Sequence, residues 1–261
     1  MTQVLVAQAD GVCELRLNRP EKRNALTLAM YGALGEAIRK AEADDSVQVI
    51  LLSGAGESFT AGNDLADFLS GPALDEQHQA LRFIRQLPDI RKVLIAAIQG
   101  ATVGIGVTLL LHCDLVVAAR STQLSMPFVK LGLVPEAASS LLLPRLVGPQ
   151  RAAELLLLGQ AFDAQQAVTM GLVNRVVEDA ELAAAAWQLA RSVAAQPAHA
   201  LHATRSLLKS DVAPVKARIE AEVACFAQLL GSAEFRAAAE AFFARRRPSG
   251  AQPPPGADSA G

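Results

Sequence analysis

The spacing of apolar residues predicts alternating strands and helices through about residue 179. Residues 12–17 alternate between apolar and polar side chains, as in a strand with one buried face. Residues 47–52 and 93–98 are apolar without interruption, which is typical of strands covered on both faces. Further strands are expected over residues 114–118 and 173–177. A first helix is expected from the N-cap Thr27 to about Ala43. Further helices are expected over residues 75–87, 150–158 and 164–170, and a short apolar helix is expected to end at about His112.

Beyond Asp179 the pattern is helical only. This change predicts an α/β core followed by a C-terminal helical extension. We place the boundary near Gln196 and Pro197, with a core over residues 1–195 and a helical region over 196–247. Residues 248–261 are rich in proline and glycine, so we expect a disordered tail. The helices of the extension are expected over residues 182–195, 198–209, 214–230 and 234–245.

Composition excludes several classes of protein. The 261 residues are 51% hydrophobic, enough for a sizeable core, and the formal net charge of −2 gives no reason to expect nucleic acid. Cys13, Cys113 and Cys225 lie far apart, which argues against a disulfide framework or a zinc site. No run reaches the roughly 18 apolar residues of a membrane span, and no basic segment leads into an apolar one as in a signal peptide. We therefore expect a cytoplasmic protein that needs no metal and binds no membrane.

Two glycine-rich turns each follow an apolar strand and precede a predicted helix. They cover residues 58–65 and 100–107. Glycine permits sharp turns and close approach of a ligand, and a helix start leaves backbone N–H groups without partners. Either turn alone is most often only a tight connection. A dinucleotide motif opening at Gly104 would need a third glycine where Leu109 stands, so that reading is disfavoured.

The amino-acid sequences of these turns and of three other segments resemble those of the crotonase (enoyl-CoA hydratase/isomerase) superfamily. Residues 17–26 (LNRPEKRNAL) resemble its N-terminal signature, 59–65 (FTAGNDL) its first oxyanion loop and 100–114 its second. Residues 131–136 and 171–177 resemble later landmarks, so nearly the whole chain is covered. The resemblance implies a ββα-spiral core and C-terminal helices that support a homotrimer or a dimer of trimers. It also implies an acyl-CoA thioester substrate and no separate cofactor, since CoA is part of the substrate.

The resemblance also assigns roles to residues. It implies that the backbone N–H groups of Asn63 and Ile105 form an oxyanion hole. For Lys22 and Arg23 a solvated charge run is as good an explanation as contact with CoA, and the Asp64 side chain is expected to cap the following helix. The residues expected along the substrate and CoA are Lys22, Arg23, Ala25, Leu26, Ala61, Gly62, Asp64, Leu65 and Gly104.

The acidic residues decide which reaction is expected. Hydration of an enoyl thioester calls for two carboxylates, but Thr108 and Phe128 occupy the two positions that carry them in hydratase-like members. Glu136 remains and resembles the single glutamate of Δ3,Δ2-enoyl-CoA isomerases, although an acid after proline can also merely stabilise a helix start. We therefore predict a 3-enoyl-CoA to 2-enoyl-CoA isomerase with Glu136 as proton shuttle. Hydration with Glu136 and an otherwise positioned water, or acyl-CoA binding without catalysis, are the alternatives.

Overall fold

A six-stranded sheet forms the middle layer of the protein. The computed structural model describes residues 2–70, 74–209 and 211–246, and its main sheet has the order β1-β2-β3-β4-β6-β9. Only the β1–β2 pair is antiparallel; β2, β3, β4, β6 and β9 run parallel. The strands are β1 Val4–Ala9, β2 Val12–Leu17, β3 Val49–Gly54, β4 Val93–Ile98, β6 Leu115–Ala119 and β9 Arg175–Val177.

Burial along β3 and β4 follows the hydropathy pattern, but β2 is buried on both faces and not half-exposed as its alternation predicted. Glu14 is covered in β2 and accepts hydrogen bonds from Ser53 and Arg16. Every residue of β4 is buried, as its continuous apolar run predicts. The sequence analysis missed β1, which lies at the sheet edge with five of its six residues exposed. An edge strand of this kind needs no alternating apolar face, so its sequence carries little signal.

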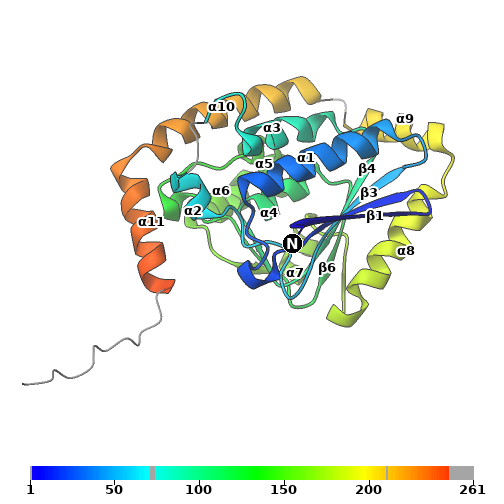
Figure 1. The fold of residues 1–261 in the computed structure, drawn as a ribbon, viewed down its shortest axis with the longest axis horizontal. Coiled ribbons are helices and arrows are strands. Elements are labelled where there is room, and N and C mark those ends of the chain that lie inside the picture. Colours follow the sequence, from blue (N-terminus) through cyan, green and yellow to red (C-terminus); the bar gives the residue numbers. More distant parts are fainter. Residues whose placement is uncertain (1, 71–73, 210, 247–261) are drawn as a thin grey trace, which may run out of the picture.

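Helices cover both faces of the main sheet (Figure 1). On one face, α8 (Leu182–Ala194) packs against β2, β3, β4 and β6 and buries Ala186 and Ala190. On the other face, α1 (Leu28–Ala43) and α3 (Gln79–Gln86) pack together over the larger part of the core. The predicted α/β architecture is therefore present as a three-layered core.

A second, small sheet carries the second glycine turn. It has the order β5-β7-β8, formed by Ala101–Val103, Gln123–Ser125 and Phe162–Asp163. Strands of two or three residues are too short to show periodicity, so the sequence did not predict them. The short helix α4 (Ile105–Thr108) begins one residue after β5, separated from it by Gly104.

The remaining helices complete the core. The predicted C-terminal helices are present, and α10 and α11 bury Ile219, Phe226 and Phe235 in the same cluster as the first helices. Helix α5 was not predicted because Pro144 lies inside it. No helix in the described ranges is long and apolar enough to cross a membrane. The predicted tail 248–261 lies outside the described residues.

These further helices are α2 Leu65–Ser70, α5 Ser139–Val147, α6 Pro149–Leu158, α7 Ala164–Thr169, α9 Ala198–Leu208, α10 Val212–Leu230 and α11 Ala233–Arg246. Short 3-10 helices occur at Pro20–Lys22, Leu87–Asp89, Leu109–His112, Val129–Leu131 and Asp179–Glu181.

Candidate active site

The two glycine turns lie side by side. The Val103 N–H donates to the Thr60 carbonyl oxygen at 3.0 Å, and the Thr60 N–H donates to the Ala101 carbonyl oxygen at 3.1 Å. Gly62 has a φ of +87°, and a Cβ atom there would lie 3.0 Å from the Val103 carbonyl oxygen. The first turn therefore requires glycine both for its backbone conformation and for its contact with the second turn.

Each turn presents one free backbone N–H to the same cavity. Gly104, with a φ of +57°, is the N-cap of α4, so Ile105 is the first residue of that helix. Among the described residues, no acceptor takes a hydrogen bond from the amide N–H of Asn63 or of Ile105. Both residues line a cavity of about 320 Å³, together with Ala61, Gly62, Leu65 and Gly104. Two unpaired N–H groups at one cavity are suited to hold an oxyanion.

The rest of this cavity is mostly apolar. Phe128 and Leu131 line it, and Phe226 of α10 and Ala238 of α11 supply a wall from the C-terminal helices. A wider hollow of about 590 Å³ lies between the main sheet and α8, but neither glycine turn's free amide opens into it. We therefore place the site in the smaller cavity. In the described part of the chain, no group of three or more His, Cys, Asp or Glu side chains is arranged to hold a metal ion.

Glu136 is a buried carboxyl group with a strongly perturbed acidity. Its residue is 7% exposed, and burial raises its pKa to about 8, with the negative charge of Glu222 raising it further and the Asn63 side chain acting in the opposite direction. Helix α5 begins only at Ser139. Within the described chain, Glu136 Oε1 has no hydrogen-bond partner. A buried carboxyl with a raised pKa is suited to proton transfer, and the Glu136 side chain does not cap α5.

Tyr31 joins the site, and the sequence analysis did not identify it. This residue, the single tyrosine of the chain, is fully buried on α1, and its hydroxyl donates to Asn63 Oδ1. Burial raises its pKa well above the usual value, and the nearby charge of Glu136 adds to the effect. Its place on the apolar face of a helix made it look like core, yet a buried tyrosine hydroxyl normally needs a polar partner. That requirement was the available signal.

The segment expected to contact CoA runs beside the first turn. The Ala61 N–H donates to the Arg23 carbonyl oxygen at 2.8 Å, and the Leu26 N–H donates to the Gly62 carbonyl oxygen at 2.8 Å. Ala25 lies between these two contacts, and the side chains of Lys22 and Arg23 are exposed. The structure therefore brings this segment next to the Asn63 amide, with its two cations facing solvent.

Asp64 has a structural role in the same region. Its carboxylate accepts the Ala66 N–H at 3.1 Å at the start of α2, and Arg19 donates to it at 2.6 Å. Burial acts to raise the pKa of Asp64, but the Arg19 guanidinium and the helix N–H groups hold it below the usual value. The side chain therefore caps the helix, as predicted, and anchors the N-terminal signature to the first turn.

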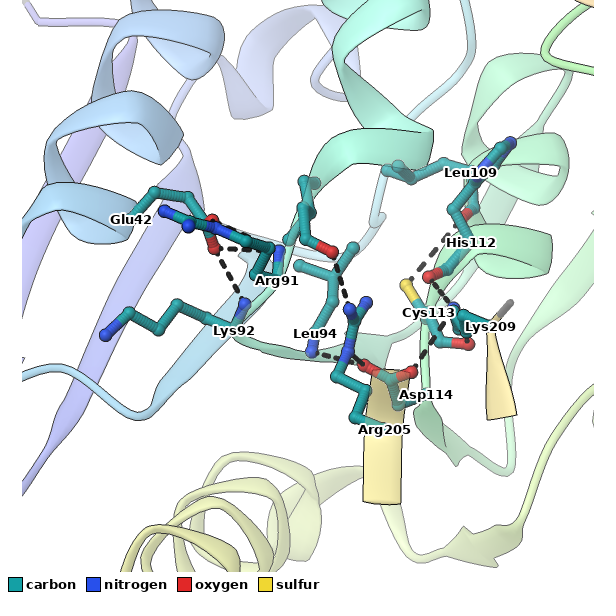
Figure 2. Close-up of polar contacts among 11 residues, drawn as sticks. Glu42, Arg91, Lys92, Leu94, Leu109, His112, Cys113, Asp114, Arg205 and Lys209 are labelled. Atoms are coloured by element: carbon teal, nitrogen blue, oxygen red, sulfur yellow. Dashed lines mark hydrogen bonds and ion pairs between the residues drawn. The ribbon is translucent and has the colours of Figure 1, made fainter. Parts of the chain in front are cut away.

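Helix α9 holds the segment between α4 and β6 through a polar network (Figure 2). Asp114, directly before β6, accepts the Leu94 N–H at 2.8 Å and Arg205 Nε at 2.7 Å. Lys209, at the end of α9, lies 3.2 Å from the other Asp114 oxygen and also donates to the His112 carbonyl oxygen. Because Arg205 is 7% exposed, this pairing is buried and ties α9 firmly to the main sheet.

The two positions where hydratase-like proteins carry glutamates are occupied by groups that cannot ionise. Phe128 places an aromatic ring on the cavity wall. Thr108 is fully buried on α4, and its hydroxyl has no hydrogen-bond partner among the described residues.

Three comparisons relate the chain to known proteins. A sequence model described as Enoyl-CoA hydratase/isomerase matches residues 7–252. The 1,2-epoxyphenylacetyl-CoA isomerase of Escherichia coli (strain K12) is 39% identical over 247 residues, covering 91% of this chain and 94% of that protein. The enoyl-CoA delta isomerase 2 of Rattus norvegicus is 34% identical over 214 residues, covering 80% of this chain and 54% of that protein. A crystal structure of an enoyl-CoA hydratase/isomerase from Pseudoalteromonas atlantica T6c matches with a TM-score of 0.90 and 38% identity, covering 96% of this chain and 100% of that one.

Proposed function

The chain belongs to the enoyl-CoA hydratase/isomerase family, and we propose that it moves the double bond of a 3-enoyl-CoA to the 2 position. Family membership makes the protein an acyl-CoA-processing enzyme and confirms the predicted crotonase-like fold with C-terminal helices. The position of the bond shift, the roles of individual residues and assembly as a homotrimer or a dimer of trimers are the parts that we propose.

In this proposal Glu136 carries one proton between two carbon atoms. Its ionised carboxylate takes a proton from C2 of the 3-enoyl thioester, and the electron pair spreads over C2, C4 and the thioester oxygen. The N–H groups of Asn63 and Ile105 stabilise the negative oxygen of this dienolate. The protonated Glu136 then returns the proton to C4, which leaves a 2-enoyl-CoA and regenerates the carboxylate. No atom is gained or lost, so one acid suffices.

The observation that carries the proposal is the buried Glu136 carboxyl close to Asn63. It is a buried carboxyl with a pKa raised to about 8 by burial and by Glu222, beside the residue that offers the first free amide. A pKa near the working pH suits a group that must both accept and return a proton. Addition of water calls for two carboxylates, but the two positions expected to carry them hold Thr108 and Phe128.

We place the CoA moiety along the segment beside the first turn. The exposed Lys22 and Arg23 can approach its phosphates, and the backbone at Ala25, Leu26 and Ala61 to Leu65 can approach its pantetheine and adenine. Gly104 lies where the thioester would meet the second turn. Because CoA is part of the substrate, the reaction as proposed needs no further cofactor.

The test is a substrate panel for the wild type and Glu136→Gln. The panel contains 3-enoyl-CoA and 2-enoyl-CoA thioesters of several lengths, and 1,2-epoxyphenylacetyl-CoA because of the similarity to the Escherichia coli protein. We expect isomerisation of 3-enoyl-CoA by the wild type and a loss of roughly 10²- to 10⁴-fold in Glu136→Gln. Full activity of Glu136→Gln would refute its role. Hydration faster than isomerisation would favour a hydratase, and binding of thioesters without turnover a non-catalytic member.

A further inference from the structure

The backbone directly after Glu136 has an unusual conformation. Ala137 and Ala138 both have a φ of +57°, in the left-handed region that L-residues with a Cβ atom seldom adopt. Two such alanines in succession persist only if surrounding contacts hold them. Any relaxation of this turn would move the adjoining Glu136, so the contacts that hold it bear on the site.

Glu222 provides one of these contacts from a distant part of the chain and also binds the residue that follows the turn. It lies on α10 and is 6% exposed. Its Oε2 accepts the Ala138 N–H at 2.6 Å, and its Oε1 accepts the Ser140 N–H at 2.9 Å and the Ser140 hydroxyl at 2.5 Å. One carboxylate thus binds three donors on both sides of the helix start, and one of the three lies inside the strained turn.

His112, the last residue of the 3-10 helix Leu109–His112, contacts the same turn. Its Nε2 lies 2.8 Å from the Ala137 carbonyl oxygen. A carbonyl oxygen only accepts, so this ring nitrogen carries the proton. Burial lowers the pKa of His112 to about 4, so the ring is neutral at ordinary pH. The turn is therefore held at the Ala137 carbonyl by a neutral donor and at the Ala138 amide by an anionic acceptor.

We propose that Glu222 is a positioning residue that holds the left-handed turn Ala137-Ala138 and thereby keeps the Glu136 carboxyl in its place for proton transfer. The inference rests on the proposed function for the reaction it serves. Ala138 is the N-cap of α5, so Glu222 caps this helix, but an N-cap residue normally has an extended backbone and capping alone does not account for the left-handed conformation that Glu222 holds here. A serine or asparagine would also cap a helix without placing a second carboxylate near Glu136.

The charge of Glu222 has a second consequence. Its negative charge disfavours ionisation of Glu136 and contributes to the raised pKa of that group. Burial also raises the pKa of Glu222, while the donors at Ser140 and Ala138 act to lower it. The other groups around the pair are Tyr31 from α1, the Asn63 amide, neutral His112, and Arg218, whose Nη1 lies 3.3 Å from the Ser140 hydroxyl. Removing the charge while keeping the volume should therefore lower the pKa of Glu136.

The first experiment compares Glu222→Gln with Glu220→Gln. Glu220 lies on the same helix, but its carboxylate is exposed and pairs with Arg85 at 2.7 Å, so it is a matched control. Glutamine offers one acceptor where three donors converge, so the turn loses contacts. We expect the kcat of Glu222→Gln to fall roughly 10- to 100-fold with KM nearly unchanged. We also expect the rising limb of its kcat–pH profile to move to lower pH. The control should match the wild type.

A rescue variant separates positioning from general damage to the fold. Glycine adopts a φ of +57° without strain, so Ala138→Gly in the Glu222→Gln background should recover part of the lost kcat. Ser140→Ala removes only one of the three contacts, and we expect a smaller decrease in kcat. It replaces Glu222→Gln in the comparison if that variant does not fold. A uniform loss of activity that Ala138→Gly does not relieve would overturn the proposal.

Amide hydrogen exchange reads the turn without any reaction. In Glu222→Gln, protection should fall in peptides that contain Ala138 and Ser140 and remain unchanged in peptides from β4. Unchanged protection at Ala138 and Ser140 would overturn the positioning role whatever the substrate. Lost protection together with a wild type that does not isomerise 3-enoyl-CoA would refute the proposed function but retain the role of Glu222 in the turn.

Discussion

Replacing Glu136 by glutamine should change the free energy of unfolding relative to the wild type by an amount that rises with pH. The folded pKa of this carboxyl is about 8 against a usual 4.5, with burial as the main cause. Because the folded pKa is raised, the wild type has its full free energy of unfolding from this group below pH 4.5. That free energy falls as the pH rises from 4.5 to 8, since ionisation costs more in the folded state. With about 1.4 kcal/mol per pKa unit, wild-type folding loses on the order of 3 kcal/mol between pH 4.5 and 7. The Glu136→Gln variant does not lose this free energy of unfolding, because its side chain stays neutral at every pH.

The measurement is the free energy of unfolding in urea at several pH values from 4.5 to 8, at one protein concentration. The difference between Glu136→Gln and wild type isolates this group, since all other titrating groups are shared. An unpaired amide in the variant lowers its free energy of unfolding by about 1–3 kcal/mol, and this loss does not change with pH. Glu76→Gln, at an exposed position, serves as the control and should show no such trend. A difference that stays constant from pH 4.5 to 7 would refute the reasoning.

Four further outcomes follow from the same contacts. In the proposed reaction the Glu136 carboxylate must be ionised to accept a proton, so kcat should rise with pH toward about 8, and a profile that is flat from pH 6 to 9 would contradict this. Tyr31→Phe removes the hydroxyl bound to Asn63 and should lower kcat by about tenfold with an unchanged circular dichroism spectrum. Gly62→Ala forces a side chain into a left-handed position and should cost about 1–2 kcal/mol of stability and most of the activity, measured by urea unfolding and turnover. Arg205→Ala removes the buried guanidinium from Asp114, which keeps Lys209 and the Leu94 N–H as partners, and urea unfolding should show a loss of about 1–3 kcal/mol.

The sequence by itself determined the family and the local elements with strong periodicity. Strand β4 follows from its uninterrupted apolar run, and the two turns follow from glycines at the points where strands end. Elements without a repeat were missed, namely the exposed edge strand β1, the very short strands of the second sheet, and α5 with its internal proline. Periodicity reports burial over several turns or strand pairs, so segments that are short or exposed leave no such trace.

Only the tertiary structure decided which distant residues meet at the candidate site. Tyr31 reaches Asn63 across 32 positions, and Glu222 reaches Ala138 across 84 positions. No local pattern carries such contacts, because they depend on how helices pack over the sheet. The acidity of Glu136 is set in the same way, since both its burial and the charge of Glu222 arise only when α10 folds back onto the core. The sequence singled out Glu136 as the candidate acid, and the packing around it determined its pKa and its position.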